Sequence, residues 1–396
     1  MRLEDRIKTA LERKLSTPPA TRGSWDRVEQ GIRRRIRRRT AFTGAAVAIA
    51  VAGGALATPR ILNWSPDLRP ATAPFAVALA SKISIEGVPT ALAINERTNR
   101  VYVASSGRRV VTVIDGTTDQ VIATINLPEP KPRTEPPFES QAYSLLGEIV
   151  AMHADNVVFV AGFDDIYRIN AADNTVRPLN LDIIGGQLAG LAVDQDLGIF
   201  YFTWGRDIVA MESDGTVLWR VDSGTRAVGL AVDEVLHRVF ALAERGPLIA
   251  LDGITGREVG SSKRDYDAHP LVPMGVDEKR HRVYFGEISD RIHVVDGSTL
   301  GHIETIEDIH ANGLHIGLGI LLVSSDTREG FSEGVLSGYE LGQRRPAQRL
   351  ALPSRAERSG DAVVAGSGLP ALASNPNTGK IYLVSPGTGE VFVVTV

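Results

Sequence analysis

RVYVASSGRRVVTVIDGTTDQVIATI, residues 100–125, contains runs of β-branched and aromatic residues separated by turn signals. Such runs favour β-strands, and an Asp-Gly pair such as Asp115-Gly116 favours a tight turn between two antiparallel strands. Several short strands joined by tight turns form one antiparallel sheet. The stretch therefore predicts consecutive strands of a single sheet.

The same pattern recurs along the chain. Five segments align, each with a short apolar strand, a turn that begins with Asp or Asn, and a strand rich in β-branched and aromatic residues. They are ALAINERTNRVYVA (91–104), GLAVDQDLGIFYFT (190–203), GLAVDEVLHRVFAL (229–242), PMGVDEKRHRVYFG (273–286) and ALASNPNTGKIYLV (371–384). The Asp-Gly signal of 111–125 returns at 247–260 and 291–306. Each unit thus has four strands, as a β-propeller blade does.

The repeat spacing predicts the number of blades. Residues 89–396 comprise 308 residues, or seven units of 44, and propeller repeats are about 40–50 residues long. The alignment leaves two gaps, near 143–181 and 310–352, and the segments 146–181 and 312–341 supply one degenerate blade for each. We therefore predict an all-β, seven-bladed propeller.

The two ends of the repeat region predict how the ring closes. The last unit stops after its third strand, EVFVVTV (390–396), and an unassigned strand, FAVALASKISIE (75–86), precedes the first unit. We expect residues 75–86 to supply the outer strand of the seventh blade, because this pairing closes the ring and removes exposed sheet edges.

Residues 100–125 resemble the repeat of YVTN-type β-propeller proteins, a bacterial and archaeal cell-surface and periplasmic family related to the NHL and WD-repeat propellers. Units 229–260 and 273–306 resemble the same repeat less closely. The resemblance implies a binding or scaffold module of the cell envelope, although some relatives are lactonases or redox enzymes. It implies the fold more firmly than the function, because one fold hosts many functions.

The N-terminal region has the pattern of a membrane anchor. Residues 40–59 carry no charged side chain, and a 20-residue helix is about 30 Å long, the thickness of the hydrocarbon core of a bilayer. The preceding Arg33–Arg39 cluster favours a cytoplasmic N-terminus and contact with anionic lipid. The alternative is an export signal cleaved near Ala57. We predict a single-pass bacterial membrane protein with a basic cytoplasmic helical segment (1–39), a transmembrane helix or signal segment (40–59), a Pro-rich linker (60–74) and an extracytoplasmic propeller (75–396).

Charge and composition exclude several functions. The net charge of −4 combines +8 in residues 1–40 with −12 in the rest, and an acidic propeller argues against nucleic-acid binding. The chain has no cysteine, which excludes disulfides, zinc-cysteine sites and thiolate nucleophiles. It also lacks a haem-attachment pair, a zinc-protease helix, a nucleophile elbow and a phosphate loop. We therefore predict no cofactor, and we expect a monomer.

Polar residues that recur in the repeat differ from those that break it. Recurring residues are expected to shape turns, and they are Asn95, Asp194, Asp233, Asp277 and Asn375 after the first strand, with Asp115, Asp252 and Asp296 after the third. Loops 263–270 and 307–312, which lead from one blade to the next, break the symmetry. Candidate channel-rim residues are Arg226, Asp265, Tyr266, Asp267, His269, Asp308 and His310. His269 and His310 occupy matching positions, and two histidines with carboxylates could bind a metal or act as acid and base.

Three functional hypotheses follow. The leading one is a non-enzymatic binding or scaffold module for a protein or cell-wall partner on one face of the propeller. The second is an enzyme of lactonase or lyase type with its site at loops 263–270 and 307–312. The third is a transmembrane signalling protein that reports ligand binding to the cytoplasmic helices.

Overall fold

The computed structural model describes residues 77–129, 148–162, 165–179, 188–268, 272–287, 289–326, 333–353 and 371–396. The chain divides into two compact units, Met1–Pro74 and Phe75–Val396. The predicted basic segment, membrane or signal segment and linker all lie outside the described residues. Among the residues that are described, no helix has the length and apolar character needed to cross a bilayer.

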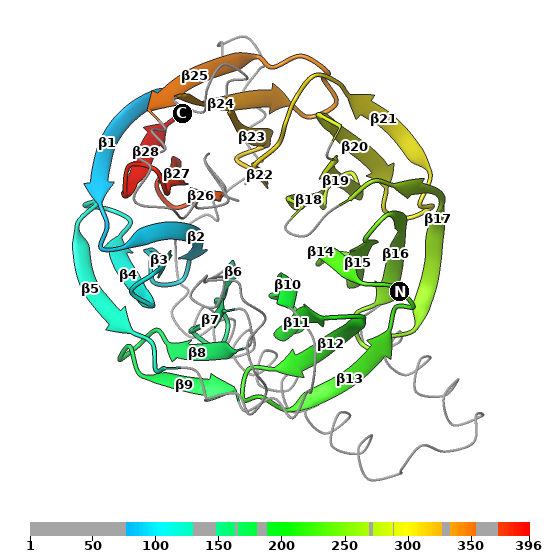
Figure 1. Ribbon diagram of the computed structural model, residues 1–396, viewed down its shortest axis with the longest axis horizontal. Coiled ribbons are helices and arrows are strands. Elements are labelled where there is room, and N and C mark those ends of the chain that lie inside the picture. The colour runs from blue at the N-terminus through cyan, green and yellow to red at the C-terminus, as the bar shows by residue number, and fades with distance from the viewer. Residues whose placement is uncertain are drawn as a thin grey trace, which may run out of the picture. The chain divides into compact units, whose positions relative to one another are not determined.

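The described strands form seven four-stranded antiparallel sheets arranged as blades around a central axis (Figure 1). Blade 1 contains β2 (Val88–Asn95), β3 (Arg100–Ser106), β4 (Val110–Asp115) and β5 (Val121–Asn126), and blade 2 contains β6 (Glu148–Met152), β7 (Val157–Ala161), β8 (Ile166–Asn170) and β9 (Val176–Leu179). Blade 3 contains β10 (Leu188–Asp194), β11 (Ile199–Trp204), β12 (Asp207–Glu212) and β13 (Val217–Asp222), and blade 4 contains β14 (Ala227–Asp233), β15 (Arg238–Ala243), β16 (Gly246–Asp252) and β17 (Glu258–Tyr266). Blade 5 contains β18 (Met274–Asp277), β19 (Arg282–Glu287), β20 (Arg291–Asp296) and β21 (His302–Ile306), and blade 6 contains β22 (Gly313–Gly317), β23 (Ile320–Asp326), β24 (Glu333–Glu340) and β25 (Gln348–Pro353). Blade 7 contains β26 (Leu372–Asn375), β27 (Lys380–Ser385), β28 (Glu390–Thr395) and β1 (Ala78–Ser84).

The prediction of an all-β, seven-bladed propeller is confirmed, and both degenerate units form complete blades. One boundary was wrong, because the outer strand of blade 6, β25, lies beyond the segment 312–341 that was expected to supply the blade. The gap of 310–352 contains most of β25, but the segment 312–341 ends before this strand, because the polar turn between β24 and β25 is longer than the Asp-Gly turns of the regular blades.

Each blade begins at the centre of the ring and ends at its outer wall (Figure 1). Because the strands are antiparallel, the turn after the first strand and the turn after the third strand lie on the same face. We call this the inner-turn face, and it includes turns 195–198, 234–237 and 278–281. The opposite face, which we call the loop face, carries the second turn of each blade and the crossing to the next blade.

The apolar strands are explained by packing between blades. The buried residues fall into seven clusters, and each cluster joins two neighbouring blades. Between blades 2 and 3, for example, the rings of Phe159 and Phe200 stack with centroids 4.3 Å apart. The second and third strands are covered on both faces, which is why their sequences are continuously apolar instead of alternating.

The predicted closure of the ring is confirmed. β1 pairs antiparallel with β28, from Ala78 opposite Thr395 to Ser84 opposite Glu390, and lies beside it in Figure 1. Ile83 is buried in the cluster that joins blades 7 and 1. The N-terminal strand therefore both completes the last blade and packs against the first.

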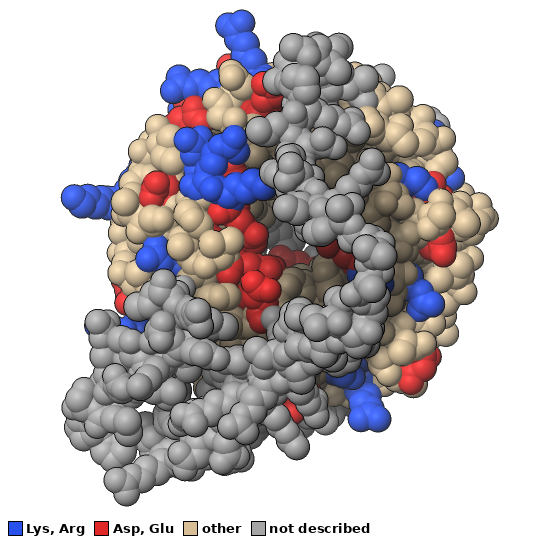
Figure 2. Space-filling view, turned by 180° about the vertical axis from the view of Figure 1, so that it is seen from behind, with Lys and Arg blue, Asp and Glu red and all other residues tan. Residues whose placement is uncertain are grey.

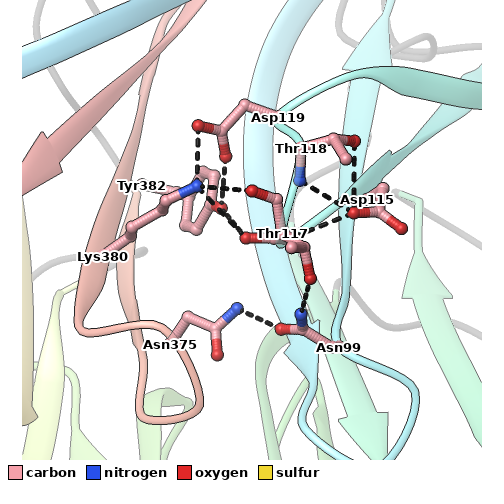
Figure 3. A network of polar contacts seen from close by, with 9 residues as sticks. Asn99, Asp115, Thr117, Thr118, Asp119, Asn375, Lys380 and Tyr382 are labelled. Atoms are coloured by element: carbon pink, nitrogen blue, oxygen red, sulfur yellow. Dashed lines mark hydrogen bonds and ion pairs between the residues drawn. The ribbon is translucent and has the colours of Figure 1, made fainter.

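A polar network also connects blades 7 and 1 at this junction, on the inner-turn face (Figure 3). The Lys380 ammonium lies 2.8 Å from Asp119 Oδ2 and donates to the carbonyls of Gly116 and Thr117. The Tyr382 hydroxyl donates to Asp119 Oδ1 at 2.8 Å. Because Asp119 belongs to the turn after the third strand of blade 1, these bonds tie the second strand of blade 7 to the next blade.

The recurring acids and amides shape turns, as predicted. The five residues that end the first strands are all buried. Asp194 Oδ1 accepts a hydrogen bond from the Leu197 amide at 2.8 Å. In the turn after the third strand of blade 4, Asp252 Oδ1 accepts from the amides of Ile254 and Thr255 at 3.2 and 2.9 Å. These carboxylates are therefore part of the scaffold.

One turn glycine supports a stability prediction. Gly256 has φ +67°, and a Cβ there would lie 2.6 Å from the Trp219 ring of the previous blade. We expect Gly256→Ala to destabilise the protein by about 2 kcal/mol, since backbone strain adds to a steric clash. The matched control is Asn174→Ala at φ 60° in blade 2, which should cost only about 1 kcal/mol. Equal costs in urea denaturation would show that Trp219 does not constrain the turn.

Candidate functional site

The loop face of blades 4 and 5 brings together most of the candidate rim residues. β17 ends at Tyr266, and the chain then crosses towards the inner strand of blade 5, which puts Asp265 and Asp267 at the strand end. Asp308 and His310 lie on the corresponding crossing after β21. His269 lies outside the described residues, so its pairing with His310 stays a prediction.

Polar contacts join the loops of blades 4 and 5. A guanidinium nitrogen of Arg226 lies 4.0 Å from a carboxylate oxygen of Glu244. The neighbouring Arg245 lies 3.5 Å from Asp267, and the Asp267 amide donates to Glu287 Oε1 at 2.9 Å. Arg226 and Asp267 therefore belong to one continuous polar surface that runs across the two blades.

Glu287, at the end of β19, is bonded to this surface but has only 7% of its own side chain exposed. Its Oε2 accepts from the Ser289 hydroxyl at 2.7 Å and lies 3.0 Å from His293 Nε2. Arg291 lies 3.9 Å away. Burial alone would raise the pKa of Glu287, but the hydrogen bonds from Ser289, His293 and the Asp267 amide outweigh it and lower the pKa to about 2. Glu287 is therefore ionised at neutral pH.

His293 is the buried partner of Glu287 and has no solvent exposure. Its ring packs 5.0 Å from that of Tyr266, and its Nδ1 lies 3.2 Å from the Thr305 hydroxyl. Burial lowers the pKa of His293, more than Glu287 raises it, so the ring is neutral at neutral pH. The ionised carboxylate can only accept, which assigns the ring proton to Nε2.

The candidate residues differ in accessibility. Tyr266 is buried against Phe285, with ring centroids 4.7 Å apart, so its side chain belongs to the core and not to the rim. Asp265 and Asp308 are exposed. His310 has half of its side chain exposed, and its Nδ1 lies 3.0 Å from Asp290 Oδ1.

Neither Glu287 nor His293 was found from the sequence, although a signal existed. β20 has the sequence RIHVVD, and His293 stands where the equivalent strand of blade 1 has Thr112. An ionisable residue in an otherwise apolar central strand indicates a buried partner. The partner itself could not be inferred. Glu287 is the last residue of β19, and nothing in the sequence distinguishes a buried acidic residue at a strand end from an exposed one.

The site presents polar side chains that are bonded to one another and could contact a partner. Among the described residues, no group of three or more His, Asp or Glu side chains is arranged to hold a metal ion. Glu287 and His293 are enclosed and bonded to each other. The exposed Asp265 and His310 and the half-buried Asp290 are held by strand ends and loop contacts, so they offer a fixed pattern of charges and hydrogen-bonding atoms to a partner.

The centre of the ring carries a second concentration of charge. Figure 2 shows Asp and Glu side chains gathered beside the central hollow. Glu234 and Glu278, in the inner turns of blades 4 and 5, interact with each other and with Asp194 and Asp196 of blade 3. Burial and the nearby Glu278 raise the pKa of Glu234 to about 8. Sequence reasoning assigned only a turn-forming role to this region.

A family model described as outer membrane protein assembly factor BamB matches residues 107–263. The matched region runs from the turn before β4 into β17, and so includes parts of blades 1 and 4 and all of blades 2 and 3. It is less than half of the chain, so it shows similarity of the propeller repeats. No curated protein matches the chain.

Breaking the Glu287 cluster should lower stability. Because its folded pKa of about 2 lies below the ordinary 4.5, ionised Glu287 contributes stability above about pH 4.5, and this is lost as the pH falls through 2. We expect Glu287→Gln to cost about 2 kcal/mol at pH 7 and much less near pH 2.5.

The control is Glu307→Gln. Glu307 also pairs with Arg291 but has 59% of its side chain exposed, so its loss should cost at most about 0.5 kcal/mol. Urea denaturation at both pH values measures the difference. A Glu287→Gln cost that does not change with pH would contradict the assignment of an ionised Glu287.

Proposed function

We propose that this protein is an extracytoplasmic β-propeller that binds a protein partner and acts as a scaffold. The similarity of residues 107–263 to an outer-membrane assembly factor carries this proposal. The closed ring supports it, because seven blades packed through seven apolar clusters give a rigid body with large faces. The partner surface in this proposal is the loop face of blades 4 and 5.

The N-terminal region fits the same proposal. Residues 40–59 form a single transmembrane anchor, Arg33–Arg39 contact anionic lipid, and residues 60–74 are a spacer that carries the propeller on the outer side of a bacterial cell membrane. The resemblance of residues 100–125 to YVTN-type repeats of surface proteins supports this placement. Determining the first residue of the mature, membrane-associated protein tests this placement. A mature chain that begins at Thr58 would mean that the preceding residues are a cleaved export signal and not a membrane anchor.

Crosslinking tests the partner surface. A photoreactive residue is placed at Asp265 or His310 on the loop face, and at Thr124 on the exposed outer wall as a control, since all three positions are solvent-exposed. We expect one discrete adduct with a protein from the two loop-face positions and none from Thr124. Adducts of the same size from all three positions, or from none, would contradict a partner at this face.

A further inference from the structure

Four polar side chains form a continuous line of hydrogen bonds in the outer part of blade 5. His293 Nε2 lies 3.0 Å from Glu287 Oε2, and His293 Nδ1 lies 3.2 Å from the Thr305 hydroxyl. The same hydroxyl lies 3.0 Å from His302 Nε2. We call these four residues the Thr305 relay. The relay runs from a buried carboxylate to an exposed imidazole.

The positions of the protons in the Thr305 relay follow from its buried end. Ionised Glu287 only accepts, so His293 carries its proton on Nε2 and its Nδ1 is an acceptor. The Thr305 hydroxyl therefore donates its single proton to His293 Nδ1. Since that proton is already used, His302 Nε2 donates to Thr305 Oγ1. The hydroxyl proton is thus held against a neutral imidazole whose other nitrogen is bonded to a carboxylate.

A β-bulge in β21 brings His302 to the hydroxyl. Residues three apart on a regular strand point to opposite faces of the sheet. In blade 5, Thr305 is opposite His293, and the register then shifts between Val294 and Val295. His302 is consequently opposite Val295, which shares a face with His293. The bulge therefore puts His302 on the same face as Thr305, and bulges next to functional sites commonly re-aim a side chain in this way.

Other blades have the same bulge but different residues at these positions. In blade 1, Thr124 is opposite Thr112, and in blade 4, Ser261 is opposite Ile249. Thr124 and Ser261 are exposed hydroxyls on outer strands, but the residue opposite each of them is not a histidine. These blades form without such a relay, so the blade architecture does not require the one in blade 5.

The hydroxyl end of the relay faces solvent beside a cation. Thr305 is half-buried and His302 is exposed. Burial lowers the pKa of His302, and Arg264 of the neighbouring outer strand β17 lowers it further (Figure 1). Arg264 has the same effect on His293, so its guanidinium lies close to both imidazoles. A cation at this place stabilises the negative charge that develops on a carbonyl oxygen under attack.

The order of carboxylate, imidazole and hydroxyl is that of the triads that transfer acyl groups. Both hydrogen bonds of His293 lie within the range that such groups need. The ring is turned so that Nε2 faces the carboxylate and Nδ1 faces the hydroxyl, but either nitrogen can take a proton. We propose that Thr305 is a nucleophile that takes the acyl group of a small carboxylic ester, with His293 as its base and Glu287 as a positioning residue.

The reaction is an ester hydrolysis through an acyl-threonine. Thr305 Oγ1 attacks the carbonyl carbon while its proton moves to His293 Nδ1, and Glu287 stabilises the imidazolium that forms. When the bond to the leaving group breaks, the departing alkoxide takes this proton and leaves as an alcohol. Water then attacks the acyl-threonine and gives a proton through His293 to Thr305 Oγ1, which releases the carboxylic acid. This activity is separate from the binding of a protein partner.

Acetylation of the full-length protein by p-nitrophenyl acetate tests the proposal. Release of nitrophenolate gives the rate, and digestion after an acid quench followed by mass spectrometry locates the acetyl group. We expect Thr305 to be acetylated about 100-fold faster than the control hydroxyls of Thr124 and Ser261. An unlabelled Thr305, an acetyl group on His302 instead, or equal labelling of the three hydroxyls would overturn the proposal.

Variants of the relay separate chemistry from a structural effect. Thr305→Val keeps the shape of a half-buried side chain and should remove the rapid phase of nitrophenolate release, whereas Thr305→Ser should keep it. His293→Gln should slow acetylation about 100-fold. A rapid phase that persists in Thr305→Val, or an unchanged rate in His293→Gln, would show that the relay does not transfer acyl groups. If His293→Gln fails to fold, the two Thr305 variants decide the question.

The pH profile tests the role of Glu287. The rate of acetylation should rise as His293 loses its proton. Burial lowers the pKa of His293, and the hydrogen bond and charge of Glu287 oppose this effect. Glu287→Gln should therefore slow acetylation and move the half-maximal rate to lower pH. A slower reaction with an unchanged pH profile would show that Glu287 does not act through His293.

Discussion

Deletion of residues 75–86 should abolish the single cooperative unfolding transition of the propeller. β1 is the outer strand of blade 7, and without it the whole edge of β28 is exposed. The deletion also removes Ile83 and Ile85 from the core between blades 7 and 1. Loss of one buried isoleucine costs about 2–5 kcal/mol, and a whole domain is stable by only about 5–15 kcal/mol. Calorimetry of the purified protein should therefore show a broad transition at much lower temperature.

A rearranged chain separates strand pairing from ring closure. Ala78 lies opposite Thr395, so residues 77–86 appended after Val396 through a short glycine turn can pair with β28 as a hairpin. If the missing strand alone matters, this variant recovers the wild-type melting temperature. If the link between the two ends of the chain matters as well, recovery is partial. An unchanged transition after simple deletion would contradict the closing role of β1.

The fold could be predicted because the physical cause of the pattern is local. Strands that pack on both faces are continuously apolar, and each sharp turn needs an Asp, Asn or Gly at a fixed place, so every blade repeats the same signals. The closing strand could be predicted because the last unit has only three strands and one unassigned strand precedes the first unit. Blade 6 was expected in the right part of the chain, but the segment 312–341 left out its outer strand, because the turn before β25 is longer than in the regular blades and has no Asp-Gly pair.

The candidate site was only partly predictable, because its contacts join residues from different blades. Tyr266 was expected at a loop rim, but β17 extends through nine residues to Tyr266. Side chains of a strand alternate between its faces, so Tyr266 shares the inward face with Ser262 and is buried, whereas Asp265 points outward and is exposed. The charged residues of this segment predicted a loop, although the segment forms the end of β17.

Hydrogen bonds between side chains of neighbouring blades, such as that of His237 with Asp194, could not be predicted from the sequence for a similar reason. His237 and Asp194 are separated by 43 positions, and nothing local indicates that an inner turn contacts the end of the preceding inner strand. The repeat register shows only that both positions recur. Their contact depends on the lateral packing of blades, which the strand pattern does not specify.

Asp119→Asn should lower the free energy of unfolding by about 3 kcal/mol, because it leaves the largely buried Lys380 ammonium without its counter-ion. The side chains of Lys380 and Asp119 are only 17% and 16% exposed. Asparagine preserves the shape of the side chain and tolerates the φ of 59° at this position. The substitution therefore removes the charge with little backbone strain, and urea denaturation measures the loss.

A surface pair in the same ring supplies the control. Arg206 and Asp222 lie 3.3 Å apart, but each side chain is 60% exposed, so Asp222→Asn should cost at most about 0.5 kcal/mol. Adding Lys380→Met to Asp119→Asn should restore most of the lost stability, because no uncompensated charge then remains buried. Equal effects of Asp119→Asn and Asp222→Asn, or no recovery in the double variant, would show that the polar network of Figure 3 does not hold the ring closed through its ion pair.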